Sequence, residues 1–461
     1  MREPYRADEL RRLMAPRSVA VVGASPTPTS LGWRTLQNLQ GFAGRVYPVN
    51  ARYGEIAAQR CFASLADLPE VPDCVVLAVG KDQVEAVARD CAARGVGSLV
   101  VFASGYAEIA APDGAASQQW LAEIGRTAGM RIVGPNCAGL ASHRGGACVA
   151  FASFRTALPP GSKAVGLVSQ SGALGLSLSQ AVEHGAAISH VLSCGNSCDV
   201  DVADYVGHLA NDGDCHAIAL VFEGVGEPAR LAAAARRAAS AGKSVIACKL
   251  AASVEGAAAA RFHTATPAGT REGFAALAAE AGIIAIDRVE TLIETAAFFA
   301  KARGLLARGS GIGVISASGG TAILAADVAA RHGVALPPLA AATADALRAS
   351  LPAFAAIRNP CDVTAQAAAQ PDMMVACARA MLADPSVAAL IAPWGRTLKG
   401  DVLERLGVAG REAGKPVCIV WMSQWLEGHG AADAMANPDI ALFRSMDSCV
   451  AALAAWLRAA R

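Results

Sequence analysis

Short apolar runs alternate with alanine-rich stretches of helical length along the whole chain, and this alternation constrains the fold more than any other feature. Residues 18–22, 217–222 and 417–421 are examples of runs that are apolar at nearly every position. A strand of this kind is buried on both faces, as in a parallel sheet that helices cover on both sides. The pattern therefore predicts an α/β fold built from doubly wound sheets.

The composition excludes several classes of protein. Hydrophobic residues make up 54% of the 461 residues and charged residues 17%, so global disorder is excluded. Forty lysines and arginines balance 39 acidic residues, which removes the electrostatic case for a nucleic-acid or anionic-membrane partner. No apolar stretch reaches the roughly 18 residues of a membrane span, and the N-terminus has no hydrophobic signal region. We therefore expect a cytoplasmic protein.

The alternation divides into about three domains, as the length suggests. The first, residues 1–145, is expected to be Rossmann-like, with strands at 18–22, 45–49, 74–79, 98–102 and 131–133. A stretch rich in glycine and proline, residues 145–161, then resembles a linker. The second domain, residues 160–303, is expected to have strands at 164–168, 188–192, 217–222, 244–249 and 283–286. The third, residues 308–461, is expected to have strands at 312–316, 388–391 and 417–421.

The second and third domains begin with the same pattern. Strand residues, serines and a glycine stand at identical offsets in Val165–Gly172 and Ile312–Gly319. One interpretation is that Ser and Gly serve many strand-to-helix turns. The alternative, which we favour, is that both domains are related and flavodoxin-like.

The thirteen cysteines give no metal-binding pattern. Most stand inside apolar runs, and their number is odd, which is typical of a reducing compartment. Cys194 and Cys198 are the only close pair, and no second pair lies nearby. We therefore predict no metal site.

A glycine turn follows the first predicted strand. In Gly23, Ala24 and Ser25 the backbone amides can approach a phosphate, although an ordinary tight turn would have the same sequence. The turn is not the G-x-G-x-x-G of a dinucleotide fold. At the end of the second strand, Asn50 and Arg52 stand where an NAD-binding fold usually has an acid. A phosphorylated nucleotide such as CoA is therefore favoured over an NAD-dependent dehydrogenase.

Two further motifs follow strands of the second domain. Ser171 and Gly172 would begin a helix whose amides point at an anion, unless the serines only cap that helix. His263 lies in a loop of small residues after a strand, where open α/β sheets bind ligands. Glu223 ends another strand and could hold one imidazole nitrogen, which would leave the other nucleophilic.

Six ordered motifs together resemble a known family. They are Val22–Ser25, Tyr47–Asn50, Gly134–Gly139, Ser169–Gly175, Gly195-Asn196 with Asp199-Val-Asp201, and Glu223–Val225, and the third domain adds Arg358–Thr364. The chain resembles the NDP-forming acyl-CoA synthetases, relatives of succinyl-CoA synthetase. Within them it is similar to the CoA-binding subunit of the ADP-forming acetyl-CoA synthetase type.

The resemblance implies a role for each matching position. Gly23, Ala24, Ser25 and Asn50 would contact CoA, Ser104 and Gly105 would line the same crevice, and Asn136 would stand near the thiol. Ser171 and Gly172 would bind the phosphoryl group, His263 would carry it, and Glu223 would orient His263. In such enzymes an acyl phosphate forms, CoA attacks its carbonyl, and phosphate passes between histidine and nucleotide.

The resemblance also implies partners. The family uses an ATP-grasp module for ATP or ADP with Mg²⁺, and no stretch of this chain is left for one, so a separate ATP-grasp subunit is expected. A small carboxylic acid would be the substrate, and the assembly would be a hetero-oligomer or a homodimer.

The loop around the histidine departs from the family pattern. The chain has Phe262-His263-Thr264-Ala265-Thr266-Pro267 where the family usually has Ser-His-Thr-Gly-Ala. The alternative hypothesis is therefore a CoA- or acyl-CoA-binding protein of the same fold without catalysis. At the predicted phosphate site, Gly172→Asp is expected to leave the fold intact but to weaken phosphoryl transfer, because the added carboxylate repels the phosphate.

Overall fold

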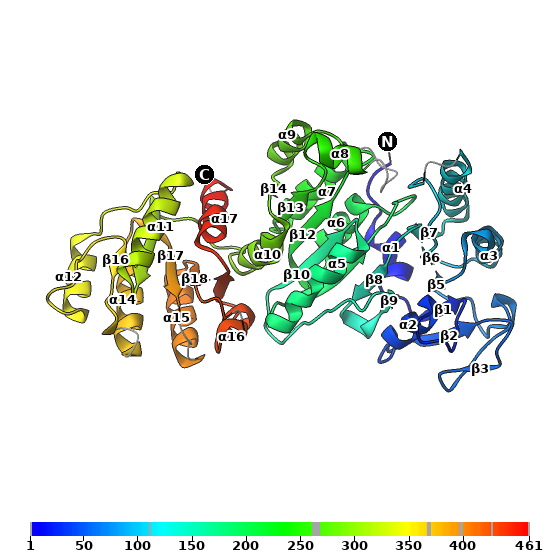
Figure 1. The fold of residues 1–461 in the computed structure, drawn as a ribbon, viewed down its shortest axis with the longest axis horizontal. Coiled ribbons are helices and arrows are strands. Elements are labelled where there is room, and N and C mark those ends of the chain that lie inside the picture. Colours follow the sequence, from blue (N-terminus) through cyan, green and yellow to red (C-terminus); the bar gives the residue numbers. More distant parts are fainter. Residues whose placement is uncertain are drawn as a thin grey trace. The chain divides into compact units, whose positions relative to one another are not determined.

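The computed structural model describes residues 2–109, 112–260, 268–366, 370–395, 400–425 and 427–459. The chain forms two compact units. The first contains residues 1–158, 164–182 and 188–292, and the second is built mainly from residues 293–461. Each unit is built on mainly parallel β-sheet with helices packed on its faces, which confirms the predicted α/β class (Figure 1).

The first sheet is entirely parallel. Its strands, in spatial order, are β2 (Arg45–Val49), β1 (Ser18–Val22), β5 (Cys74–Leu77), β6 (Ser98–Val101) and β7 (Arg131–Val133). Its helices are α1 (Ala7–Met14), α2 (Leu31–Asn38), α3 (Lys81–Arg94) and α4 (Pro112–Ala128). A short hairpin, β3 (Glu55–Ile56) and β4 (Gln59–Arg60), follows β2.

Successive side chains of a strand point to opposite faces of the sheet, so alternate residues of these strands belong to two different hydrophobic cores. Ala20 and Val75 belong to the core with α3, whereas Val19 and Val76 belong to a core that includes α1. That second core continues into the helices and strands of the second sheet. The first two sheets therefore form one unit.

The second sheet has seven strands. In spatial order they are β14 (Ile284–Ile286), β13 (Val245–Lys249), β12 (Cys215–Phe222), β10 (Ala164–Ser169), β11 (Ile188–Ser193), β8 (Gly139–Ser142) and β9 (Cys148–Ala150). Its helices are α5 (Gly172–Ser179), α6 (Val202–Asn211), α7 (Pro228–Ser240), α8 (Val254–Ala260) and α9 (Arg271–Ala281).

Strands β8 and β9 correct the predicted linker. They pair antiparallel with each other, and β8 pairs antiparallel with β11. Ala157 also bridges to Ile188. Residues 148–150 and Ala157, inside the stretch 145–161, are therefore paired in the second sheet. Edge strands of three or four residues have too few apolar positions to stand out in the sequence. The predicted domain limits themselves stay a prediction.

The second unit contains helix α10 (Leu292–Lys301) and a five-stranded parallel sheet. Its strands are β16 (Cys361–Asp362), β15 (Gly311–Ser316), β17 (Val387–Trp394), β18 (Val417–Trp421) and β19 (Ile440–Phe443). Its other helices are α11 (Gly319–Arg331), α12 (Ala341–Ser350), α14 (Pro371–Ala383), α15 (Gly400–Ala413), α16 (Ala431–Ala436) and α17 (Met446–Ala459).

The two similar sequence segments have the same local structure. Strand β10 leads to α5, which begins at Gly172 after the cap residue Ser171. Strand β15 leads to α11, which begins at Gly319 after Ser318. Of these two serines, only Ser171 has a side chain that accepts a hydrogen bond from the helix that follows it. The shared pattern thus specifies a strand-to-helix turn in both domains.

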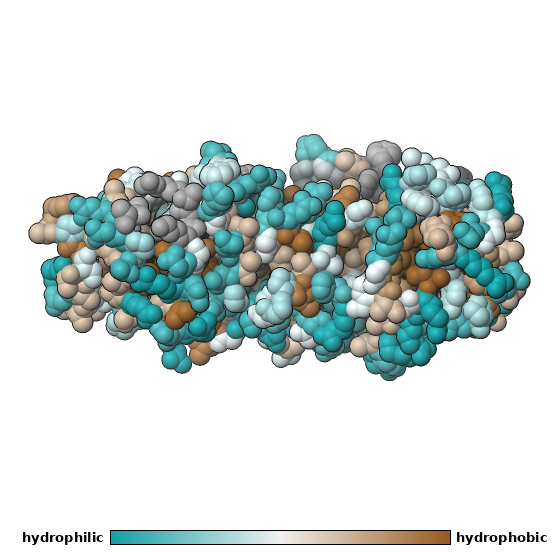
Figure 2. Space-filling view, turned by 90° about the horizontal axis from the view of Figure 1, so that it is seen from below, coloured by the Kyte–Doolittle hydropathy of each residue, from teal (hydrophilic) through white to brown (hydrophobic). Residues whose placement is uncertain are grey.

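No helix among the described residues is long and apolar enough to cross a membrane. On the face shown in Figure 2, hydrophilic residues surround small hydrophobic patches.

Lys301, at the end of α10, is partly buried in the second unit. Its Nζ donates to the carbonyl oxygens of Met435 and Ile440 at 2.6 and 2.7 Å. Burial lowers the pKa of this amine to about 7. The unfolded chain, whose lysine pKa is about 10.4, therefore binds more protons than the folded chain above about pH 7.

The free energy of unfolding of the second unit is therefore predicted to rise as the pH rises from 7 to 9. In this range the unfolded chain binds more protons than the folded chain, so removing protons favours the folded state. The slope from one group is at most about 1.4 kcal/mol per pH unit. Lys301→Met should flatten the pH dependence, since it removes the titrating amine. Urea unfolding of both proteins at pH 7, 8 and 9 measures this, and parallel curves would contradict the assignment.

Candidate functional site

A cavity of about 380 Å³ lies in the first unit where loops from its two sheets meet. Parallel strands β10 and β12 end at this edge, so the residues that follow them share one wall. The lining includes four of the predicted site residues: Asn136, Ser171, Gly172 and Glu223. Phe102, Phe151 and Leu176 form an apolar part of the wall. The structure thus brings together residues separated by almost ninety positions in the sequence.

The start of helix α5 forms one side of the cavity. Ser171 is its cap, and the Ser171 Oγ accepts from the amide of Leu174 at 3.4 Å. The amides of Gly172 and Ala173 line the cavity and have no hydrogen-bond acceptor among the described residues. Unpaired amides at a helix N-terminus carry partial positive charge and suit an anion.

Gly172 is required by close packing. A Cβ atom at this position would lie 2.5 Å from the Cβ of Ala138 in the loop after β7. The expectation that Gly172→Asp leaves the fold intact is therefore wrong, because the larger side chain would displace that loop. This variant cannot separate phosphate binding from packing.

Glu223 is held at the end of β12 by a glutamine from the neighbouring strand end. The Gln170 Oε1 accepts from the amides of Glu223 and Gly224 at 2.8 and 3.2 Å. Both Gln170 and Glu223 are buried. The fork of two hydrogen bonds fixes the loop that carries the carboxylate beside the start of α5.

His263 lies outside the described residues, so the structure does not test its place beside Glu223. The described chain leading toward it is anchored by Lys249 at the end of β13. The Lys249 Nζ donates to the carbonyl oxygens of Leu250 and Ala251 at 2.8 and 3.2 Å. Helix α8 follows and ends at Ala260.

Asn136 belongs to a polar network behind the cavity. Its Nδ2 donates to the Asn196 Oδ1 at 3.3 Å. Asn196 in turn donates to the Oε2 of Glu108 at 2.5 Å and to the Oε1 of Gln118 at 2.9 Å. Burial opposes ionisation of Glu108, but the hydrogen bonds from Asn196 and Gly105 hold its pKa below the usual value. The network joins loops of both sheets.

Ser104 and Gly105 follow β6, but no helix begins there directly, unlike at Gly172. The amide of Gly105 donates to the Glu108 Oε1 at 2.5 Å, within the turn. Neither residue lines the cavity described above. Their assignment to a CoA crevice stays a prediction.

The turn after β1 brings Gly23, Ala24 and Ser25 together with Asn50. Gly23 has a φ of +87°, and a Cβ there would lie 2.3 Å from the carbonyl oxygen of Ala78. The Asn50 Nδ2 donates to the carbonyl oxygen of Ala24 at 2.7 Å, which ties the end of β2 to this turn. Asn50, which favoured CoA in the sequence analysis, therefore stabilises this turn through its side-chain amide.

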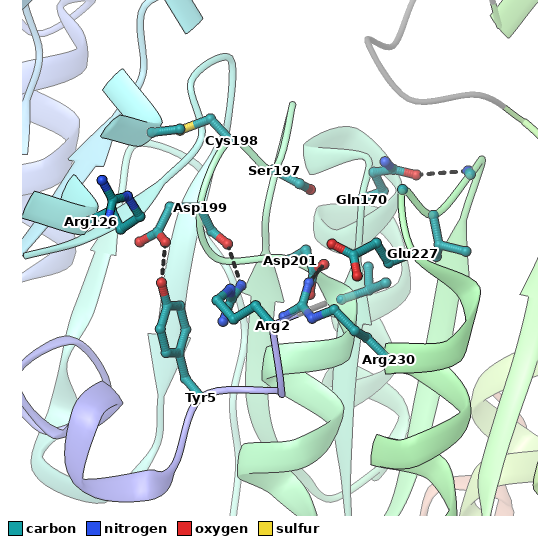
Figure 3. A pocket seen from close by; sticks show the side chains of 15 residues that line it. Arg2, Tyr5, Arg126, Gln170, Ser197, Cys198, Asp199, Asp201, Glu227 and Arg230 are labelled. Carbon is teal, nitrogen blue, oxygen red and sulfur yellow. Dashed lines mark hydrogen bonds and ion pairs between the residues drawn. The ribbon is translucent and has the colours of Figure 1, made fainter. Parts of the chain in front are cut away.

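A second pocket, of about 300 Å³, lies on the other side of the loop that carries Ser197 (Figure 3). Arg230 of α7 pairs there with Asp201 and with Asp204, the latter at 2.8 Å. Arg2 reaches the same Asp204 at 2.8 Å. Burial and the neighbouring charge of Asp204 raise the pKa of Asp201 to about 6. Two arginines and two aspartates thus form a charge cluster, in which Arg2, Arg230 and Asp201 line the pocket and Asp204 is fully buried.

Several residues of these sites were missed by the sequence analysis. They are Gln170, Glu108, Gln118, Lys249 and Arg230. Gln170 stands within the matched motif Ser169–Gly175, so its position beside Ser171 was a usable signal. The other four belong to none of the quoted motifs, and only the packing of distant segments shows their contacts.

Comparison with known proteins defines the class of the chain. Residues 17–143 match a CoA binding domain, residues 162–299 a succinyl-CoA ligase like flavodoxin domain, and residues 312–461 a ligase-CoA domain. These three domains together are those of a CoA ligase.

Individual relatives give the family. The alpha subunit of the ADP-forming acetate–CoA ligase II of Pyrococcus furiosus is 32% identical over 379 residues, which cover 82% of this chain and 80% of that protein. A trans-feruloyl-CoA synthase from an unidentified prokaryote is 35% identical over 83% of this chain. The chain spans about half (54%) the length of that synthase. The chain belongs to the family of ADP-forming acetate–CoA ligases, which confirms the resemblance inferred from the motifs.

Solved structures agree with this assignment. The acetyl-coenzyme A synthetase 1 of Ca. Korarchaeum cryptofilum, in complex with phosphate and ADP, superposes with a TM-score of 0.85 at 28% identity. The alignment covers 98% of this chain and 97% of that chain. Such coverage extends across all three sheets described above.

Proposed function

We propose that the chain is the CoA-binding catalytic subunit of an ADP-forming acyl-CoA synthetase. The observation that supports this most directly is the cavity that joins the free amides of α5, the carboxylate-bearing loop of Glu223 and the loop of Asn136. A helix N-terminus suits a phosphoryl group, and a carboxylate beside it suits a histidine that carries one. The family relationship supplies the reaction: a carboxylic acid, CoA and ATP become acyl-CoA, ADP and phosphate.

Each predicted residue has a proposed role in this reaction. The amides of Gly172 and Ala173 stabilise the phosphoryl charge, and His263 carries the group. Glu223 orients His263 and stabilises its imidazolium form. Gly23, Ala24 and Ser25 contact CoA, whose thiol provides the nucleophile for the acyl group.

The nucleotide requires a partner in this proposal. An ATP-grasp subunit would bind ATP and Mg²⁺, as the alpha-subunit names of the relatives suggest. The cavity has apolar walls at Phe102, Phe151 and Leu176, which suit the carbon skeleton of an acid. The substrate class is a small carboxylic acid.

The proposal is tested by combining the purified chain with an ATP-grasp subunit, CoA, Mg²⁺, ATP and a panel of carboxylic acids. ADP release that depends on both acid and CoA, with acyl-CoA formed in equal amount, is the expected result. A chain that binds CoA but is never phosphorylated, whichever ATP-grasp partner is added, would instead support the non-catalytic CoA-binding alternative.

Glu223→Gln should lower kcat about 100-fold, because the amide keeps the shape of the side chain but removes its negative charge. The loop should stay in place, since Gln170 holds the backbone of Glu223 and Gly224 rather than the carboxylate. Steady-state ADP release measures the loss. The exposed Glu227, four residues later, offers a matched control, and Glu227→Gln should change kcat less than about twofold.

A further inference from the structure

Three side chains of the second sheet converge far from the cavity. His190 lies on β11, His208 in the last turn of α6, and Asp212 directly after α6. One ligand atom of each lies within 4.8 Å of those of the other two. Strand β11 ends at Ser193, just before the cavity residues Gly195 and Asn196, and His190 lies earlier on that strand. The cluster therefore lies toward the opposite end of the strands. We propose that it binds a divalent transition metal ion such as Zn²⁺.

Hydrogen bonds orient His190 as a ligand. The Ser189 Oγ donates to the carbonyl oxygen of Val165 at 3.4 Å and lies 3.0 Å from the His190 Nδ1. Because the serine proton is already used, Nδ1 is the donor, which leaves the lone pair on Nε2. A second hydrogen bond of this kind fixes the tautomer of metal-binding histidines.

Asp212 is oriented in the same way. Its Oδ1 accepts from the amides of Asp214 and Cys215, both at 2.9 Å. Its Oδ2 has no hydrogen-bond donor among the described residues. One carboxylate oxygen is thus anchored to the turn and the other is available to a cation.

A bound metal ion would give the His208 ring the partner that its buried nitrogen lacks among the described residues. Its Nδ1 is buried and has no hydrogen-bond partner in the described part of the chain. Leaving a buried polar group unpaired costs about 1–3 kcal/mol, so a ligand for this ring is energetically favourable. Burial lowers the pKa of both imidazoles, and neutral rings are the form that binds metals.

The donor set selects the class of ion. Two imidazoles and one carboxylate suit zinc and similar first-row ions rather than Ca²⁺ or Mg²⁺, which prefer oxygen ligands. Tetrahedral ligands at about 2.1 Å from zinc lie about 3.4 Å apart, so ligand atoms that lie within 4.8 Å of one another must close by up to about 1.4 Å. The ring of His208, whose Nδ1 has no hydrogen-bond partner among the described residues, can supply this movement. Lys243 donates to the carbonyl oxygens of Leu209 and Asp212, and its charge opposes the ion.

The test is Zn²⁺ titration of the full chain by calorimetry after chelator treatment. We expect one ion per chain, and affinity lowered about 100-fold in His208→Gln and in Asp212→Asn. The second variant keeps the Oδ1 acceptor of the turn, so it should fold even if the first does not. The exposed His184 gives a matched control, and His184→Gln should bind Zn²⁺ like the wild type.

Cobalt provides a second readout. Bound Co²⁺ should give the visible absorption of a nitrogen- and oxygen-ligated tetrahedral site, and Asp212→Asn should lose it. Unchanged Zn²⁺ affinity in the folded Asp212→Asn variant would overturn the proposal. So would a sulfur-to-cobalt charge-transfer band, since it would assign the ion to cysteines.

Discussion

His263→Asn is expected to lower acyl-CoA synthesis at least about 1,000-fold and to abolish acid-labile, base-stable phosphorylation of the chain. Asparagine has a similar size and can form hydrogen bonds, but it has no nucleophilic nitrogen that can carry a phosphoryl group. CoA binding should persist, because the turn of Gly23, Ala24 and Ser25 belongs to the first sheet. Labelled ATP with an ATP-grasp subunit measures phosphorylation, and calorimetry measures CoA binding.

His184→Asn is the control for this experiment, because His184 is an exposed histidine within the same match to the succinyl-CoA ligase like flavodoxin domain, residues 162–299. It should keep full synthesis and phosphorylation. Full ATP-dependent synthesis by the His263→Asn variant would show that another residue, or none, carries the phosphoryl group. The altered sequence around His263 makes this the decisive test between the enzyme and the CoA-binding protein.

Arg230→Leu is expected to lower the free energy of unfolding of the first unit by about 3–5 kcal/mol. The side chains of Arg230 and Asp204 are 6% and 0% exposed, and Arg230 also pairs with Asp201. Leucine fills part of the space but leaves Asp204 paired with Arg2 alone among the described residues and removes the ion-pair partner of Asp201. An uncompensated buried charge costs more than the ion pair itself contributes.

The loss should be smaller at pH 5 than at pH 7.5. Burial already raises the pKa of Asp201 to about 6, and removal of the arginine raises it further. The folded variant therefore takes up protons as the pH falls, and this uptake stabilises it relative to the unfolded chain. Urea unfolding at both pH values measures the difference.

Arg236→Leu is the matched control on the same helix. Arg236 pairs with Glu280 at the surface, where their side chains are 50% and 69% exposed. Such pairs contribute about 0–1 kcal/mol, so this variant should unfold nearly like the wild type. If both variants lost the same free energy of unfolding, the loss of any arginine from α7 would explain the result, and the buried cluster would have no special contribution.

The sequence alone predicted the features that depend on residues adjacent to one another in the chain. Short apolar runs identified strands such as β1 and β18 with their observed limits, because a strand buried on both faces has few polar interruptions. The shared strand, serine and glycine pattern located the starts of α5 and α11. The ordered motifs also identified the family. The roles of His263, Glu223 and the CoA-contacting residues stay predictions.

Only the tertiary structure decided which distant segments meet. The short strands β8 and β9 join the second sheet because β11 offers an unpaired edge, which no local pattern encodes. A side chain at position 172 is excluded by Ala138, which belongs to a loop more than thirty residues earlier in the sequence. Asn196 donates to Glu108, and His208 converges with His190, across the interior of the first unit. A strand's period follows from its own backbone, whereas a buried polar group finds its partner only after hydrophobic packing has brought other elements beside it.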